Sequence, residues 1–283
     1  MFKRVLVPLD GSMLAESALE PALHLAEQTA GTVYLIRVPV FMDSGVQSTP
    51  EYDRGWAADH NTVPEYEDTT AYLRETRNRI ARRGVTVRTV VGEGEPANAI
   101  NNAAVDRNAD LIVIASHARK GVSRLLLGSV ADKVIGRAQI PVMLVRKAQL
   151  YKHILVTLDG SEVAERILEP ALALAEGLNC RITFFEVEDP GEDDLASPRL
   201  NYLDEIAARY SDRDIQVTTV LEKGAVADTI MSFAASNDVD LVAMSTSGRT
   251  GLQKLIFGSV TEKVMGESGR AMLIVRPAGG DTS

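Results

Sequence analysis

One sequence pattern occurs twice along the chain, and this internal repeat limits the possible folds more than any other feature. The segment KRVLVPLDGS at Lys3–Ser12 returns 149 positions later as KHILVTLDGS at Lys152–Ser161. Near the end of each copy, LLLGSVADKVIG at Leu125–Gly136 returns 130 positions later as LIFGSVTEKVMG at Leu255–Gly266. The repeat therefore predicts two tandem copies of one domain.

The two offsets also locate the domain boundaries and an insertion. We expect the first domain over residues 1–148 and the second over 150–283, joined by a short linker near Lys147–Leu150 that leaves them packed together. Because the offset falls from 149 to 130, the first copy holds 19 extra residues, within the segment 41–68. They predict a long loop over one end of the first domain, where it could cover a pocket.

Short apolar runs alternate with segments of helical periodicity in each copy. This alternation predicts an α/β fold in which each copy forms a five-stranded parallel, Rossmann-like sheet with helices on both faces. A long helix is expected over Met13–Ala30, kinked at Pro21 because proline lacks the helical N–H. The other expected elements of the first copy are strands at Val5–Leu9, Val33–Pro39, Val85–Val91, Leu111–Ala115 and Val142–Val145, and helices at Tyr66–Arg83, Pro96–Arg107 and Leu126–Gly136.

Composition limits the partners to be expected. The net charge is −9, with most of the acidic excess in the second copy, so nucleic acid is not an expected partner. A cluster of arginines between Arg74 and Arg83 predicts a solvated helix face, with a binding patch as the alternative. The sequence contains no run of about 18 apolar residues, so no membrane span is predicted. The single cysteine, Cys180, agrees with a reducing cytoplasm.

Residues able to bind a ligand gather at the carboxyl ends of the first and fourth strands of each copy, where sheets of this topology bind ligands. Asp10 and Asp159 follow the first strands and could hold ribose hydroxyls or Mg²⁺. The helix after the fourth strand begins at Gly128–Ser129 or Gly258–Ser259, so its free N–H groups and positive dipole end suit a phosphate. A plain strand-to-helix turn is the alternative interpretation.

The loops after the fourth strands carry a longer pattern. In the second copy, two residues separate Ser245 from Gly248, and nine residues separate Gly248 from Gly258–Ser259. The first copy has Ala115, Ala118 and Gly128–Ser129 at the same spacing. This spacing resembles the universal stress protein signature, in which glycines stand at the first two positions. Together with the strand-tip aspartates, it makes the chain similar to that family over two complete domains.

The resemblance implies an adenine nucleotide alpha hydrolase-like fold, a cytoplasmic stress-response role, and pairing through the last strand, either between the two copies as an intrachain pseudo-dimer or in a homodimer. It also implies that ATP binds, with or without Mg²⁺, and that a protein partner exists whose identity the sequence does not give. The nucleotide residues implied in the second copy are Asp159, Val187, Ser245, Gly248, Arg249, Gly258, Ser259 and Val260. Those implied in the first copy are Asp10, Val38, Ala115, Ala118, Arg119, Gly128, Ser129 and Val130.

The two loops differ where the signature requires glycine. The second copy keeps Gly248, whereas the first has Ala118, whose methyl group would crowd a phosphate. We therefore expect the second copy to be the better nucleotide site. Two alternatives stay open, namely an interaction module that binds no nucleotide and a slow ATPase or autophosphorylating protein, although no enzyme signature is found.

Overall fold

The computed structural model describes residues 2–39, 66–81, 84–116, 128–188, 196–246 and 257–276. Most of the insertion 41–68 lies outside these residues, as do the four loop positions Ala118, Arg119, Gly248 and Arg249. Their expected contributions to a site therefore remain predictions.

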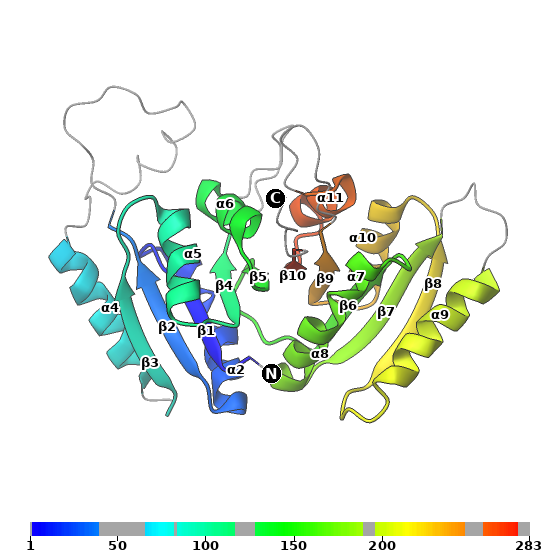
Figure 1. Ribbon diagram of the computed structural model, residues 1–283, viewed down its shortest axis with the longest axis horizontal. Helices are drawn as coiled ribbons and strands as arrows, with labels where there is room; N and C mark the ends of the chain where they lie inside the picture. The colour runs from blue at the N-terminus through cyan, green and yellow to red at the C-terminus, as the bar shows by residue number, and fades with distance from the viewer. Residues whose placement is uncertain are drawn as a thin grey trace, which may run out of the picture.

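The two copies share one ten-stranded sheet with the strand order β3-β2-β1-β4-β5-β10-β9-β6-β7-β8 (Figure 1). The neighbouring strands are parallel within each copy, as the apolar runs predicted. The strands are β1 (Arg4–Pro8), β2 (Thr32–Arg37), β3 (Thr86–Val91), β4 (Leu111–Ala115), β5 (Val142–Val145), β6 (His153–Leu158), β7 (Arg181–Glu188), β8 (Val217–Lys223), β9 (Leu241–Ser245) and β10 (Ala271–Val275).

The last strands of the two copies join the halves of the sheet. β5 and β10 run antiparallel, with Leu144 opposite Met272 and Val142 opposite Ile274. All four side chains are buried, and each strand covers the edge that the other would expose. The pairing through the last strand is therefore made within the chain, as an intrachain pseudo-dimer.

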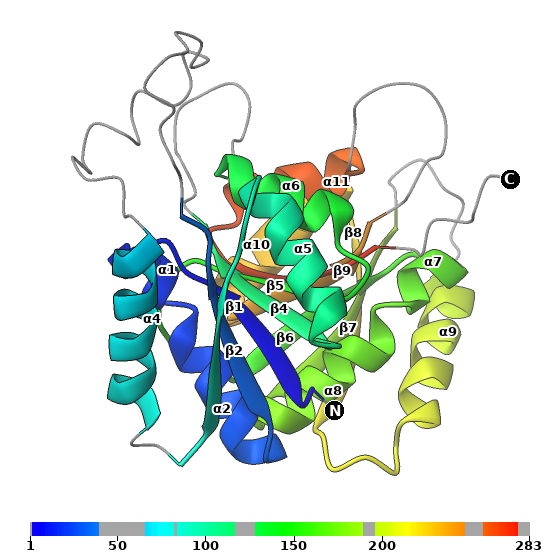
Figure 2. The ribbon, with the colours of Figure 1, turned by 60° about the vertical axis from the view of Figure 1, so that its left-hand side comes forward.

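Helices cover both faces of the sheet, and both layers continue across the two copies. One core cluster receives side chains from α2, α4, α8 and α9, and the other from α5, α6, α10 and α11. In Figures 1 and 2, α6 and α11 lie side by side over the junction of the copies. The helices are α1 (Met13–Glu16), α2 (Leu19–Thr29), α4 (Tyr66–Ile80), α5 (Pro96–Asp106), α6 (Ser129–Arg137), α7 (Glu162–Glu165), α8 (Leu168–Leu178), α9 (Ala196–Arg209), α10 (Val226–Ser236) and α11 (Ser259–Glu267).

The long helix expected over Met13–Ala30 is instead two helices. The chain leaves the α-helix at Ser17 and Ala18, whose N–H groups donate to carbonyls three residues back, at Leu14 and Ala15. Pro21 then lies at the third position of α2, within the first turn, where a missing N–H costs no helical hydrogen bond. The prediction of a kink at the proline was therefore wrong, because the break comes before it.

Candidate functional site

The sheet order places the expected ligand-binding edge at a switch point in each copy. β1 lies between β2 and β4, with Val5 opposite both Val33 and Leu111, so the connections that lead to these two neighbours run to opposite sides of β1. β6 has the same position between β7 and β9. The carboxyl ends of β1 and β4 therefore meet within the first copy, and those of β6 and β9 meet within the second, as the sequence predicted. Because β5 and β10 are antiparallel, the strands of the two copies point in opposite directions.

The strand-tip aspartates are fixed by the turns that follow them. The Asp10 Oδ1 atom accepts the Ser12 N–H at 2.8 Å, and the Ser12 hydroxyl oxygen accepts the Ala15 N–H and caps α1. Gly11 has a φ of +92°, a left-handed conformation that glycine adopts without a steric penalty. Both the turn and the cap orient a carboxylate that stays exposed to solvent.

The second copy builds the same turn with one further bond. The Asp159 Oδ1 atom accepts the Ser161 N–H at 3.0 Å and the Ser161 hydroxyl at 2.6 Å, and Ser161 in turn caps α7 through the Ala164 N–H. Gly160 has a φ of +78°. The two copies therefore present equivalent exposed carboxylates at their first strand tips.

The helices that follow the fourth strands begin without a side-chain cap. Gly128 and Gly258 occupy the N-cap positions of α6 and α11, and neither supplies a side-chain acceptor for the N–H groups of the first turn. The Gly128 N–H donates to the Ser116 hydroxyl oxygen at 3.3 Å, which closes the base of the first loop. A helix start of this kind, with its positive dipole end, is suited to an anion.

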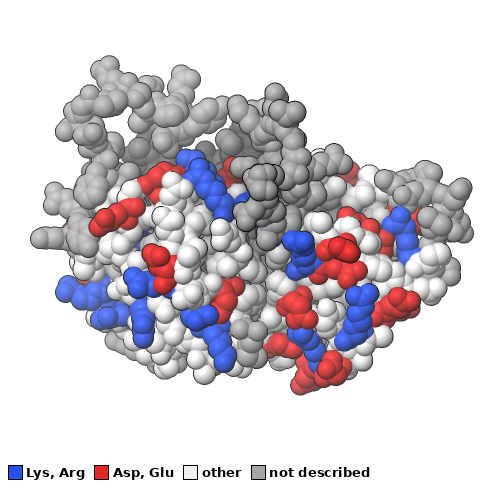
Figure 3. All heavy atoms as spheres, in the orientation of Figure 1, with Lys and Arg blue, Asp and Glu red and all other residues white. Residues whose placement is uncertain are grey.

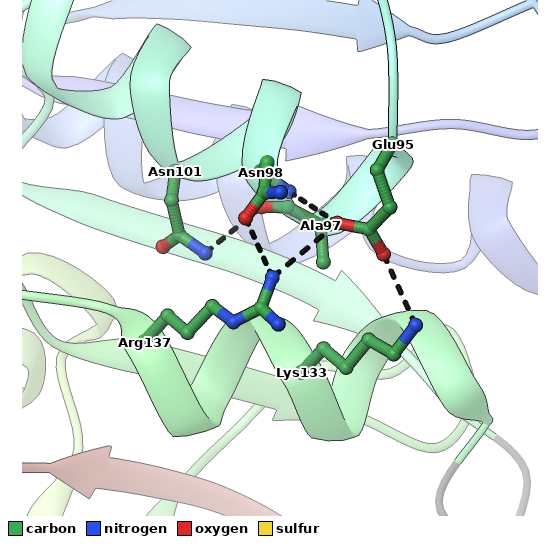
Figure 4. A network of polar contacts seen from close by, with 6 residues as sticks. All are labelled: Glu95, Ala97, Asn98, Asn101, Lys133 and Arg137. Carbon is green, nitrogen blue, oxygen red and sulfur yellow. Dashed lines mark hydrogen bonds and ion pairs between the residues drawn. The ribbon is translucent and has the colours of Figure 1, made fainter.

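Charged side chains hold α6 against α5 in the first copy (Figure 4). Glu95 caps α5 by accepting the Asn98 N–H and pairs with Lys133 at 3.2 Å and Arg137 at 3.4 Å. Arg137 also donates to the Asn98 side-chain oxygen. Burial opposes ionisation of Glu95, but the Asn98 N–H and the nearby cations together lower the pKa of its carboxyl group. The network thus fixes the helix whose N-terminus faces the candidate site.

The second copy retains a smaller version of this network. Lys263 of α11 pairs with Asp228 of α10 at 2.7 Å. On the face drawn in Figure 3, basic side chains lie beside acidic ones over both copies, as such pairs require. These contacts join exposed helices and hold their relative positions.

In both copies an ion pair also joins the short helix after the first strand to the helix that follows the second strand. Glu16 accepts the Tyr72 hydroxyl at 3.0 Å and pairs with Arg79 at 2.7 Å, which ties α4 to α1 beside the strand tip. Burial and then the Glu16 carboxylate raise the pKa of Tyr72. In the second copy Glu165 pairs with Arg209 at 3.0 Å, and burial followed by the Glu165 charge raises the pKa of Tyr202.

The two sites differ beside their strand-tip turns. In the first copy, the Arg37 guanidinium lies over the Tyr72 ring at 4.6 Å, and its nitrogens would be 3.2 Å from a Cβ placed on Gly11. In the second copy the same repeat position is Glu186, which is buried and ion-paired with Arg199. Among the described residues, a Cβ on Gly160 would meet nothing within 4 Å. The space over the turn is therefore filled by Arg37 in the first copy, whereas no described residue fills it in the second.

The structure brings most of the predicted residues of each site to the same edge. Val38 and Val187 are half-buried at the ends of their second strands, and Ala115 and Ser245 end the fourth strands. The helix starts supply Gly128, Ser129, Val130, Gly258, Ser259 and Val260. Sequence reasoning missed Arg37, Glu186 and Ser116. Arg37 and Glu186 occupy equivalent positions of the repeat but carry opposite charges, and this difference could have indicated that the two sites are not alike.

Within the six described ranges, no three His, Cys, Asp or Glu side chains gather in a way that could hold a metal ion. No helix in this part of the chain is long and apolar enough to cross a membrane.

Comparison with known proteins gives one consistent family. The universal stress protein family model matches residues 1–146 and 150–276. Universal stress protein MJ0531 of Methanocaldococcus jannaschii is 32% identical over 149 residues, covering 52% of this chain and 84% of its own length. Universal stress protein YxiE of Bacillus subtilis is 31% identical over 152 residues, covering 52% of this chain and 100% of its own.

Among solved structures, a universal stress protein from Archaeoglobus fulgidus has the same fold over nearly the whole chain. It has a TM-score of 0.73 at 20% identity and covers 99% of this chain and 97% of its own. Both copies and their arrangement are therefore matched by a known structure of the family.

Proposed function

Because the chain belongs to the universal stress protein family, we propose that it is a stress-related regulatory protein that binds adenine nucleotide at the switch point of each copy. The single observation that carries this proposal is that, in each copy, an exposed strand-tip aspartate and a helix N-terminus without a side-chain cap lie at the carboxyl ends of the same parallel strands. These groups suit the two polar parts of a nucleotide, the ribose and the phosphates. ATP, with or without Mg²⁺, is the proposed ligand.

Each element of the site has a role in this proposal. Asp10 or Asp159 accepts hydrogen bonds from the ribose hydroxyls, and Val38 or Val187 contributes apolar surface to the adenine pocket. The N–H groups at the start of α6 or α11 hold the phosphates. When bound, Mg²⁺ would neutralise phosphate charge, with an exposed strand-tip carboxylate as the oxygen ligand that the chain offers.

We further propose that the second copy is the better site. No described residue lies over its turn at Gly160, whereas the Arg37 guanidinium occupies the space over Gly11 in the first copy. The loop sequences point the same way, because Gly248 allows a phosphate to approach the backbone more closely than Ala118. The two buried carboxylates at the end of the second strand of this copy are ion-paired, Glu186 with Arg199 and Glu188 with Lys223.

Calorimetric titration with ATP and Mg²⁺ tests the proposal with a matched pair of variants. Asp159→Ala should remove the tighter binding event, and Asp10→Ala, which removes the equivalent carboxylate, should leave that event in place. A lost charge-assisted hydrogen bond is worth about 1.5–3 kcal/mol, so the affinity should fall by roughly 10- to 100-fold. An unsubstituted chain that releases no heat at high micromolar concentration would refute nucleotide binding. Equal effects of the two substitutions would refute the preference for the second copy.

A further inference from the structure

Two arginines cross the junction between the copies in a reciprocal way. Arg146 follows β5 and donates to the Met265 carbonyl near the end of α11 in the other copy. Arg276, which lies 130 positions later and follows β10, donates to the Gly136 carbonyl near the end of α6. Each last strand therefore holds the helix whose N-terminus forms the other copy's candidate phosphate site.

Arg146 makes a second contact that distinguishes it from its counterpart. A different nitrogen of its guanidinium donates to the Ser116 carbonyl at 3.2 Å, and the Ser116 hydroxyl accepts the Gly128 N–H at 3.3 Å. The loop base and helix start of the first site are thus connected, through one side chain, to the end of α11. Within the described part of the chain, Arg276 donates to the Gly136 carbonyl alone.

On the basis of this path, we propose that Arg146 is a positioning residue that couples nucleotide occupancy of the two sites. The inference rests on the proposed function, because it takes the starts of α6 and α11 as the phosphate positions. α11 has nine residues, so it is roughly 13 Å long and moves as one body. A shift of Ser116 on ligand binding in the first copy would therefore reach the start of α11 through Arg146.

Electrostatics favour the same coupling. A cation at the C-terminal carbonyls and an anion at the N-terminal N–H groups both stabilise the dipole of one helix. Burial lowers the pKa of Arg146 to about 10, so its guanidinium keeps its charge at neutral pH. A movement of Arg146 toward the Met265 carbonyl when the first site fills would thus strengthen phosphate binding at the second.

Two substitutions by lysine, Arg146→Lys and Arg276→Lys, form a matched test of the coupling. Lysine keeps the positive charge, but its three N–H donors share one nitrogen, so Arg146→Lys cannot place separate nitrogens against the Ser116 and Met265 carbonyls. Arg276→Lys loses no such bridge, because a single donor suffices for Gly136. We expect both variants to fold, and only Arg146→Lys to lose the coupling.

The coupling is measured by blocking the second site with Gly258→Leu. The second site is the tighter one and fills first, and coupling between two sites is reciprocal, so the block should weaken ATP binding at the first site about fivefold, the lower range of measured couplings. The same block should change the affinity of the first site less than twofold in the Arg146→Lys background and about fivefold in the Arg276→Lys background.

Hydrogen exchange gives a readout that does not depend on affinity. In a chain whose second site is blocked by Gly258→Leu, ATP bound to the first site should slow amide exchange at the end of α11, and Arg146→Lys should abolish that slowing. An equal effect of Gly258→Leu on the first site with and without Arg146, or none in the parent chain, would overturn the coupling while leaving the proposed function intact. An absence of any ATP binding in the parent chain would refute the proposed function and the coupling with it.

Discussion

Replacing Gly177 by alanine probes the packing between the two copies. Gly177 lies in α8 of the second copy and faces α2 of the first, where a Cβ would come 2.2 Å from the Leu25 Cδ1 atom. Nonbonded carbons sit about 3.5–4.0 Å apart, so one atom must move by more than an ångström. Leu25 is only 1% exposed, which leaves its side chain little free space.

The expected cost follows from two opposing terms. Overpacking a tight core costs about 1–3 kcal/mol. Alanine in place of glycine inside a helix returns at most about 1 kcal/mol, and less here because Gly177 is the second-last residue of α8. We therefore expect Gly177→Ala to lower the free energy of unfolding by about 1–2 kcal/mol. The loss is measured by urea unfolding followed by circular dichroism.

Leu25→Ala supplies the control. Alone it should cost about 2–5 kcal/mol, because it leaves a cavity at the junction. In that background the Gly177→Ala methyl group enters the cavity, so the sign of its effect should reverse and stability should rise. If Gly177→Ala stabilises the parent chain, or lowers stability equally in both backgrounds, the close packing of α2 on α8 is wrong.

Three further outcomes follow from individual side chains. Burial raises the pKa of Cys180 to about 12, so its thiol should react with a disulfide reagent at pH 8 only after unfolding; rapid labelling of the folded chain would contradict its placement. The pKa of Tyr72 is raised in the folded state, so above about pH 10 the unfolded state alone loses this proton and stability falls. Tyr72→Phe should make the fall between pH 10 and pH 11 shallower in unfolding titrations, and an unchanged slope would contradict the shift. Glu16→Gln breaks a pair in which Arg79 is 57% exposed, so it should cost no more than about 1 kcal/mol by urea unfolding, and a much larger loss would show that the pair is shielded from solvent.

The sequence predicted the strands better than the helices. The fourth and fifth strands, Leu111–Ala115 and Val142–Val145, have the predicted bounds, because each is a short apolar run followed directly by a polar residue. The helix expected from Leu126 begins at Ser129, since Gly128 takes the N-cap position. Periodicity alone does not mark such breaks, because apolar residues continue through them.

The contacts that join the sites could not be read from local patterns. The Arg146 contact with Met265 spans 119 positions, and it exists only because β5 pairs with β10. The guanidinium of Arg37 reaches Gly11 only when β2 lies beside β1. A repeat supplies the domains and their equivalent positions, whereas differences between equivalent sites depend on side-chain packing across strands and copies.

The most direct measurement of the central claim is the number of adenine nucleotides bound per chain, counted by native mass spectrometry as ATP is added. The account predicts two successive binding events, with Asp159→Ala removing the first and Asp10→Ala sparing it. An unliganded chain at every ATP concentration, or binding that neither substitution alters, would contradict the assignment of these strand tips as nucleotide sites.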